Sequence, residues 1–124
     1  MGLDMYLYRK NKRTGDSDEA QYWRKANWIR KWLVNHTDLD EDSNCEYTKL
    51  SKEILEQLIK DCEEVVKNHE LASELMPTAS KFFFGNTEYS DYYFENLEYT
   101  AERLREIINE TNWETEDIYY YEWW

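Results

Sequence analysis

The spacing of apolar residues changes along this chain, and that change limits its fold more than any other feature. Near the N-terminus Leu3, Met5 and Leu7 alternate with more polar residues, a period of two that predicts a half-buried strand. The last segment, 117–124, contains three consecutive Tyr and favours a second strand, which would pair most simply with the first. Between them the apolar residues recur at helical spacing. We therefore expect an α+β fold with three main helices packed on a small sheet formed by the N- and C-terminal strands.

Three segments have the period of an amphipathic helix. The first runs from residue 19 to about 35, the second from Ser51 to about Asn68, and the third starts between Thr87 and Asp91. Their apolar faces are, in order, Tyr22, Ala26, Ile29 and Leu33; Leu55, Leu58, Ile59, Cys62, Val65 and Val66; and Phe94, Leu97, Ala101, Leu104 and Ile108. Ser51 is expected to cap the second helix.

The remaining segments are shorter. Residues 9–18 and 38–44 are polar and are expected to be loops, 45–48 a short extended segment, and 70–75 a helical turn ended by Pro77. The run Phe82–Phe84 is either a short strand or a core plug. With 124 residues and no linker-like stretch, we expect one domain spanning 1–124.

Charge narrows the classes of partner. The net charge is −12, and it is uneven, because residues 1–35 carry +4 and residues 36–124 carry −16. Such a chain should be repelled by nucleic acid and by anionic membranes, so we expect no direct nucleic-acid or membrane binding. The negative net charge favours a basic protein partner, although an excess of acidic residues also keeps a protein soluble. Aromatic residues make up 17% of the chain, more than a small core hides, so exposed rings are expected to anchor a partner.

One acidic pattern stands out in the third predicted helix. Its carboxylates recur three or four residues apart and form a stripe along one face: Asp91, Glu95, Glu98, Glu102 and Glu106. Four helical residues rise about 6 Å, a distance of the same order as the separation of phosphates along a nucleic-acid strand. The stripe is therefore a candidate partner-binding site that imitates a phosphate backbone. The alternative is an ordinary solvated helix face.

A second candidate site combines cations with aromatic rings in the first quarter of the chain. Its candidate residues are Trp23, Arg24, Lys25 and Tyr89, because a ring can stack on a base while Arg pairs with phosphate. This pattern would suit a protein that sequesters an anionic nucleotide signal. The alternative is that these cations neutralise the acidic remainder of the same protein.

Catalytic and metal motifs find no support. Residues 38–46 have alternating oxygen ligands, but Ser43 stands where a calcium loop needs Gly and Lys49 where it needs Glu. His36 and His69 have no nucleophile in a recognisable motif, and Cys45 and Cys62 lack metal spacing. We therefore expect no enzyme, no metal and no cofactor. Two cysteines are too few for a disulfide scaffold and indicate a reducing compartment.

Three strings carry a resemblance to a known group of proteins. These are Met1–Leu7 (MGLDMYL), Tyr22–Asn27 (YWRKAN) and Phe82–Tyr89 (FFFGNTEY). With the aromatic C-terminal segment, they resemble a family of small, largely uncharacterised phage and prophage proteins. The resemblance implies synthesis in bacterial cytoplasm and favours an inhibitor of a host defence system, such as an anti-CRISPR protein. A nucleotide sponge, and a structural or regulatory phage protein that acts by homo-oligomerisation, are the alternatives.

Overall fold

A computed structural model describes residues 2–80 and 85–124 of the chain. The sheet contains β1 (Asp4–Asn11), β2 (Ser17–Arg24), β3 (Tyr47–Leu50) and β4 (Glu116–Trp123). The helices are α1 (Asn27–His36), α2 (Lys52–Lys67), the 3-10 turn η1 (His69–Leu71), α3 (Ala72–Leu75) and α4 (Asp91–Glu110). The strand order is β2-β1-β4-β3, and every pairing is antiparallel. The α+β prediction is confirmed.

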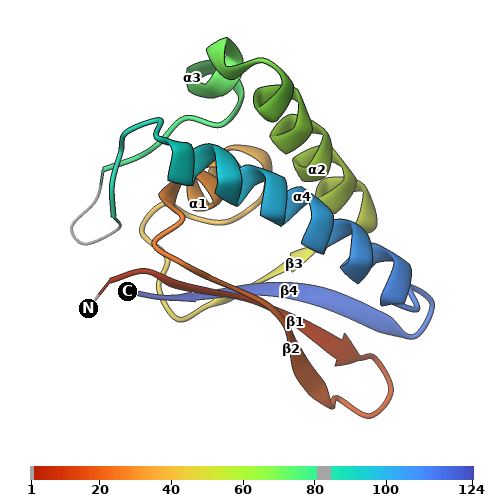
Figure 1. Cartoon of the computed structure of the whole chain (residues 1–124). Coiled ribbons are helices and arrows are strands. Elements are labelled where there is room, and N and C mark those ends of the chain that lie inside the picture. Colours follow the sequence, from red (N-terminus) through yellow and green to blue (C-terminus); the bar gives the residue numbers. More distant parts are fainter. Residues whose placement is uncertain (1, 81–84) are drawn as a thin grey trace.

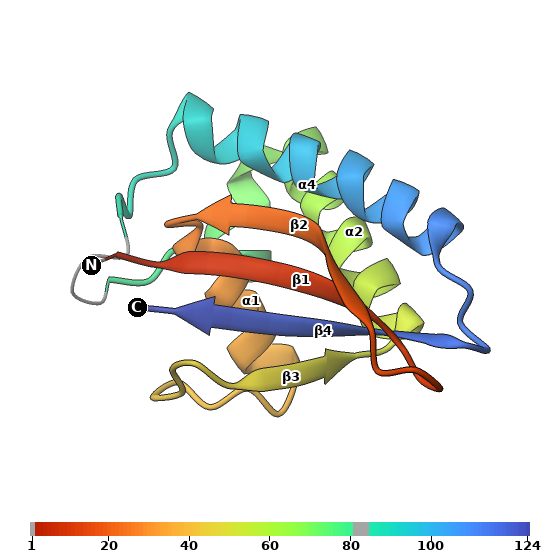
Figure 2. The same ribbon diagram turned by 90° about the horizontal axis from the view of Figure 1, so that it is seen from below.

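The two chain ends form the centre of the sheet. Strand β4 pairs with β1 along its whole length, from Asp4 opposite Trp123 to Asn11 opposite Glu116, as the sequence predicts. Both termini therefore lie on the same side of the molecule (Figure 1). The helices cover one face of the sheet, and the view from below shows the opposite face with no helix in front of it (Figure 2).

The prediction for residues 19–35 is wrong in its first half. Residues 17–24 form β2, and the helix begins only at Asn27. A turn containing Gly15, whose φ is +79°, returns the chain so that β2 pairs with β1. A register shift opposite Leu7 and Tyr8 then leaves Ala20 and Gln21 both buried, which hides the strand period. Ala26, Ile29 and Leu33 are buried as expected.

Helix α2 follows the prediction closely. Ser51 caps it by accepting a hydrogen bond from the Ile54 amide at 3.2 Å. Leu50 before the cap and Leu55 after it are both buried, which is the arrangement of a hydrophobic staple. The expected helical turn at 70–75 is present as η1 and α3. The prediction for Phe82–Phe84 lies outside the described residues.

Helix α4 is rotated slightly from the predicted orientation. Leu97, Ala101 and Leu104 are buried as expected, but Phe94 and Ile108 are only partly buried. Two residues with polar atoms are fully buried on α4 because those atoms find partners. The Tyr93 hydroxyl donates to the Met76 carbonyl at 2.6 Å, and Thr100 Oγ1 accepts from Trp23 Nε1 at 3.0 Å. Helix α4 thus packs on both α2 and the sheet, and its opposite face is left to solvent.

Candidate interaction surfaces

The acidic stripe occupies the outward face of α4. We use this name for Asp91, Glu95, Glu98, Glu102 and Glu106, all of which are exposed. At 100° per residue they fall within a narrow sector, centred opposite the buried side chains of the same helix. Ser90 caps the helix by accepting a hydrogen bond from the Tyr93 amide. The helix that carries the stripe is therefore well defined from its first turn.

Among the described residues, only one of the five stripe carboxylates has an ion-pair partner. Glu106 lies 3.4 Å from Arg103 on the same helix. For the other four carboxylates, the part of the chain that the structure describes offers no Lys, Arg or His within 4.0 Å. The stripe is therefore available to a positively charged group from outside.

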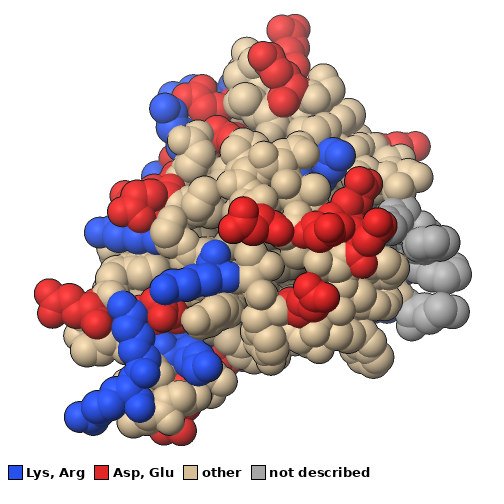
Figure 3. Space-filling model, turned by 180° about the vertical axis from the view of Figure 1, so that it is seen from behind, with Lys and Arg blue, Asp and Glu red and all other residues tan. Residues whose placement is uncertain are grey.

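Three of the eight basic residues within 1–35 form ion pairs in the described chain, and none of these pairs involves the stripe. Arg9 lies 3.8 Å from Asp18 and 3.7 Å from Glu110, beyond the end of the stripe. Lys12 pairs with Asp117 at 3.6 Å. Arg30 is buried with Glu122. These three residues therefore pair with carboxylates that lie outside the stripe. From behind, the Lys and Arg side chains gather at the corner where the β1–β2 hairpin lies, and Asp and Glu dominate other parts of that face (Figure 3).

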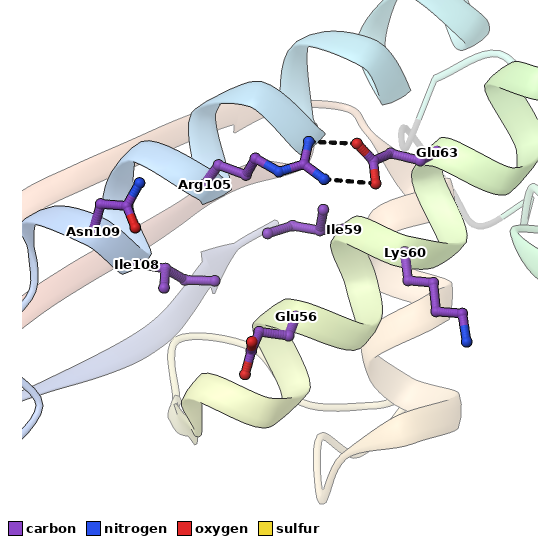
Figure 4. A pocket seen from close by; sticks show the side chains of 7 residues that line it. All are labelled: Glu56, Ile59, Lys60, Glu63, Arg105, Ile108 and Asn109. Carbon is purple, nitrogen blue, oxygen red and sulfur yellow. Dashed lines mark hydrogen bonds and ion pairs between the residues drawn. The ribbon is translucent and has the colours of Figure 1, made fainter.

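One edge of the stripe borders a groove between α2 and α4. Arg105 on α4 bridges this groove to Glu63 on α2, with Nη2 2.7 Å from Oε1 (Figure 4). The bridge divides the groove into hollows of about 370 and 410 Å³. Ile59 and Ile108 point toward one another in the first hollow (Figure 4). The hydrogen bond from Arg105 lowers the pKa of the Glu63 carboxyl below its usual value. Glu98 and Glu102 line the second hollow.

The second predicted site is only partly assembled. Trp23 and Arg24 are neighbours on β2, so their side chains point to opposite faces of the sheet, and the Trp23 ring is buried. Tyr89 packs edge-on against Tyr93, with ring centroids 5.1 Å apart, and it does not line the hollow that contains Arg24 and Lys25. Arg24 and Lys25 do share a hollow of about 280 Å³.

That hollow is poorly suited to an anion. Its wall includes the carboxylate of Glu88, and the ring of its Trp28 is 98% buried and so unavailable for stacking. The backbone there is constrained, because Lys25 has a φ of +56° and a Cβ on Gly85 would lie 2.9 Å from the Cβ of Lys25. These contacts hold two segments of the chain together.

A surface that the sequence did not single out covers the open face of the sheet. Six tyrosines from all four strands form it, and we call it the tyrosine face: Tyr6, Tyr8, Tyr22, Tyr47, Tyr119 and Tyr121. Their ring centroids lie 4.7 to 6.5 Å from their neighbours. Alternation within β1 and β4 is the signal that points to it, because buried residues separate Tyr6 from Tyr8 and Tyr119 from Tyr121.

The described residues give no indication of a metal centre or a membrane span. Within 2–80 and 85–124, no three His, Cys, Asp or Glu side chains are placed to hold a metal ion. Over the same residues, no helix has the length and apolar character that crossing a bilayer requires. Comparison with protein-family models, curated protein sequences and solved structures found no match for this chain. Its function is therefore inferred from the arrangement of its own side chains.

Proposed function

We propose that this chain is a non-enzymatic binding protein whose acidic stripe occupies the basic, nucleic-acid-binding surface of another protein. One observation carries the proposal: four exposed carboxylates in a row on α4 have no cation from the described chain beside them. Placing them together costs helix stability, since like charges four residues apart destabilise a helix by about 0.2–0.5 kcal/mol per pair. A cationic partner would remove that repulsion.

The spacing of the stripe supports imitation of a phosphate backbone. From Asp91 to Glu102 the helix rises about 16 Å, and four carboxylates lie along that rise. Nucleic acid places one phosphate per about 3.4 Å of rise on each strand, so the charges of the stripe are more widely spaced than those of a strand by less than a factor of about two. Lys and Arg side chains that bind phosphates would accept carboxylates, with long-range attraction raising the association rate.

Exposed rings beside the stripe supply anchoring surface. Tyr92 and Tyr99 on α4 are 59% and 52% exposed, and their positions place them along one flank of the stripe. Tyrosine is enriched among interface residues that dominate binding energy. The stripe would then orient the partner, while these rings hold it.

The resemblance to phage and prophage proteins supports a bacterial partner. We propose that the partner is a nucleic-acid-binding component of a host defence system, such as a CRISPR effector, and that the complex forms in the host cytoplasm. Blocking such a surface needs no chemistry, only occupancy.

The experiment is a phage-plating assay in bacteria that each carry one defence system and express this chain. Restored plating in one strain is the expected result. The stripe variant Glu95→Lys/Glu98→Lys/Glu102→Lys should lose the effect. The matched control Glu70→Lys/Glu74→Lys/Glu114→Lys changes the net charge equally at exposed positions off the stripe and should keep it. Equal activity of both variants would contradict a stripe-led mechanism.

Competition then tests the mimicry itself. With the purified target, DNA or RNA should displace the chain, and the affinity should fall steeply as salt rises. A ternary complex of target, chain and nucleic acid would show that the chain binds elsewhere on the target.

A further inference from the structure

We propose that the tyrosine face carries a second, independent site, which binds a single nucleoside phosphate in the hollow bounded by Tyr8, Lys10, Tyr47 and Tyr119. This hollow has a volume of about 350 Å³ and is completed by Gly15 and Ser17 at the hairpin. That volume is at the lower end of the range for small-molecule sites, and it suits one nucleotide better than a larger cofactor.

The rings of the hollow are arranged as walls and not as a flat sheet. Tyr47 stands at 85° to Tyr119, with centroids 6.5 Å apart, and at 55° to Tyr8, with centroids 6.1 Å apart. Tyr47 is 63% exposed, so much of its ring surface is unused by the fold. A planar base could stack on such a ring, and base–aromatic stacking accepts any base because every base has a π-face.

The side chain of Lys10 brings a positive charge to the same hollow. Lys10 Nζ is 5.9 Å from the centroid of the Tyr119 ring, and it forms no ion pair with any other residue of the described chain. Lys12 and Lys49 both lie near one carboxylate oxygen of Asp117, at 3.6 and 3.4 Å. One negative charge therefore faces two positive ones, and Lys10 adds a third. Lys10 and Lys12 belong to the β1–β2 hairpin, and Figure 3 shows Lys and Arg side chains gathered at the hairpin corner.

Stackable rings beside unpaired positive charge point to a ligand with a planar base and an anionic group. The tyrosine hydroxyls and Ser17 provide hydrogen-bonding groups for the edge of the base or the sugar. The charge of −12 argues against a long polyanion. It does not oppose a mononucleotide, because charges farther than about 8 Å are largely screened at physiological salt.

A second copy of this chain is a less suitable occupant. Four strands about 4.8 Å apart and at most eight residues long span roughly 19 by 26 Å, or about 500 Å² of projected surface. A standard protein interface buries about 800 Å² on each partner. Self-association through the tyrosine face is accordingly an outcome that the test must exclude.

The test is calorimetric titration of the full chain with AMP, GMP, cyclic AMP, adenosine and inorganic phosphate. We expect micromolar binding of at least one nucleotide, weaker binding of adenosine, and little binding of phosphate alone. Tyr47→Ser should weaken nucleotide binding at least tenfold. Lys10→Gln should weaken nucleotide binding by a similar factor and leave adenosine binding unchanged, because it removes only the phosphate contact.

Matched variants and two further measurements keep the result interpretable. Tyr22→Ser lies on the same face outside the hollow, and Lys52→Gln is an exposed lysine on α2; both should bind like the original chain. Circular dichroism shows whether each variant is folded, and light scattering shows whether the chain is monomeric. No binding of any nucleotide at millimolar concentration would overturn the proposal. So would equal loss in Tyr22→Ser, or a dimer that Tyr47→Ser dissociates.

Discussion

Arg30 on α1 and Glu122 on β4 form a bidentate ion pair in the interior, with Nε 2.7 Å from Oε1 and Nη2 3.0 Å from Oε2. Both side chains are at least 95% buried. Glu122 also accepts a hydrogen bond from the Tyr120 hydroxyl at 2.8 Å, and Arg30 donates to the Glu41 carbonyl at 2.6 Å. The pair therefore joins α1, the central strand β4 and the acidic loop after α1.

Breaking this pair should destabilise the protein strongly. Glu122→Gln removes one charge and leaves the other buried, which costs about 3–5 kcal/mol. Urea denaturation measures the change in the free energy of unfolding. Removing Arg105 from its solvent-exposed pair with Glu63 (Arg105→Gln) should cost at most about 1 kcal/mol. The double variant Arg30→Met/Glu122→Leu should cost less than the sum of the single variants Arg30→Met and Glu122→Leu. An additive result would mean that the two charges do not interact.

Neutralising the acidic stripe should stabilise α4. Glu102 has like charges four residues away on both sides, at Glu98 and Glu106, so Glu102→Gln removes two repulsions and should raise the free energy of unfolding by roughly 0.4–1 kcal/mol at low salt. The gain should shrink in 1 M salt, where screening is strong. Glu114→Gln, in the exposed turn after α4, is the control. A loss of stability in Glu102→Gln would indicate an internal partner for Glu102.

The ion pair between Glu63 and Arg105 should make the free energy of unfolding depend on pH in the acidic range. Its hydrogen bond lowers the pKa of Glu63 in the folded protein, so the pair stabilises the fold above the unfolded carboxyl pKa. That contribution is lost as the pH falls through the lower, folded value. Carboxyl NMR titration should show the depressed pKa, and Arg105→Gln should return it toward 4.5. An unchanged Glu63 pKa in that variant would show that Arg105 does not cause the shift.

Tyr22 should titrate at unusually high pH. Its hydroxyl donates to Asp4 at 2.5 Å, and this bond, with burial and the charge of Asp4, raises the pKa to about 12. Because the folded pKa exceeds the usual value of 10.0, the stabilisation is complete below pH 10 and is lost as the pH rises toward 12. Ring-carbon NMR resolves single tyrosines. Asp4→Asn should lower the Tyr22 value, and Asp16→Asn should leave it unchanged.

The two cysteines should differ in reactivity. Cys45 is exposed, whereas Cys62 is completely buried on α2. Burial, together with the nearby carboxylates of Asp61 and Glu63, raises the pKa of the Cys62 thiol, and only the thiolate reacts. A thiol reagent at pH 8 should modify one cysteine in the folded protein and two in urea. Cys45→Ser should abolish the fast reaction; its persistence would place Cys62 within reach of solvent.

Much of the architecture could be predicted because it depends on local patterns. The Ser51 cap and the apolar face that follows it specify α2 without reference to any other element. The alternation in β1 and the β-forming residues of β4 likewise predict two strands. Residues 17–24 could not be assigned this way, since a register shift places two successive residues, Ala20 and Gln21, in the interior. Pairing with β1, a tertiary contact, decides their conformation.

The two candidate sites also differ in how far the sequence predicts them. Every carboxylate of the acidic stripe lies on one helix, so its spacing in the sequence determines that the five share a face. Whether that face meets solvent or the protein's own cations depends on packing, and packing directs Arg9 to Glu110 and Arg30 to Glu122 instead. The tyrosine face needs four strands in the order β2-β1-β4-β3. Neighbours across a sheet come from distant parts of the chain, so only the tertiary structure could bring Tyr8, Tyr47 and Tyr119 together.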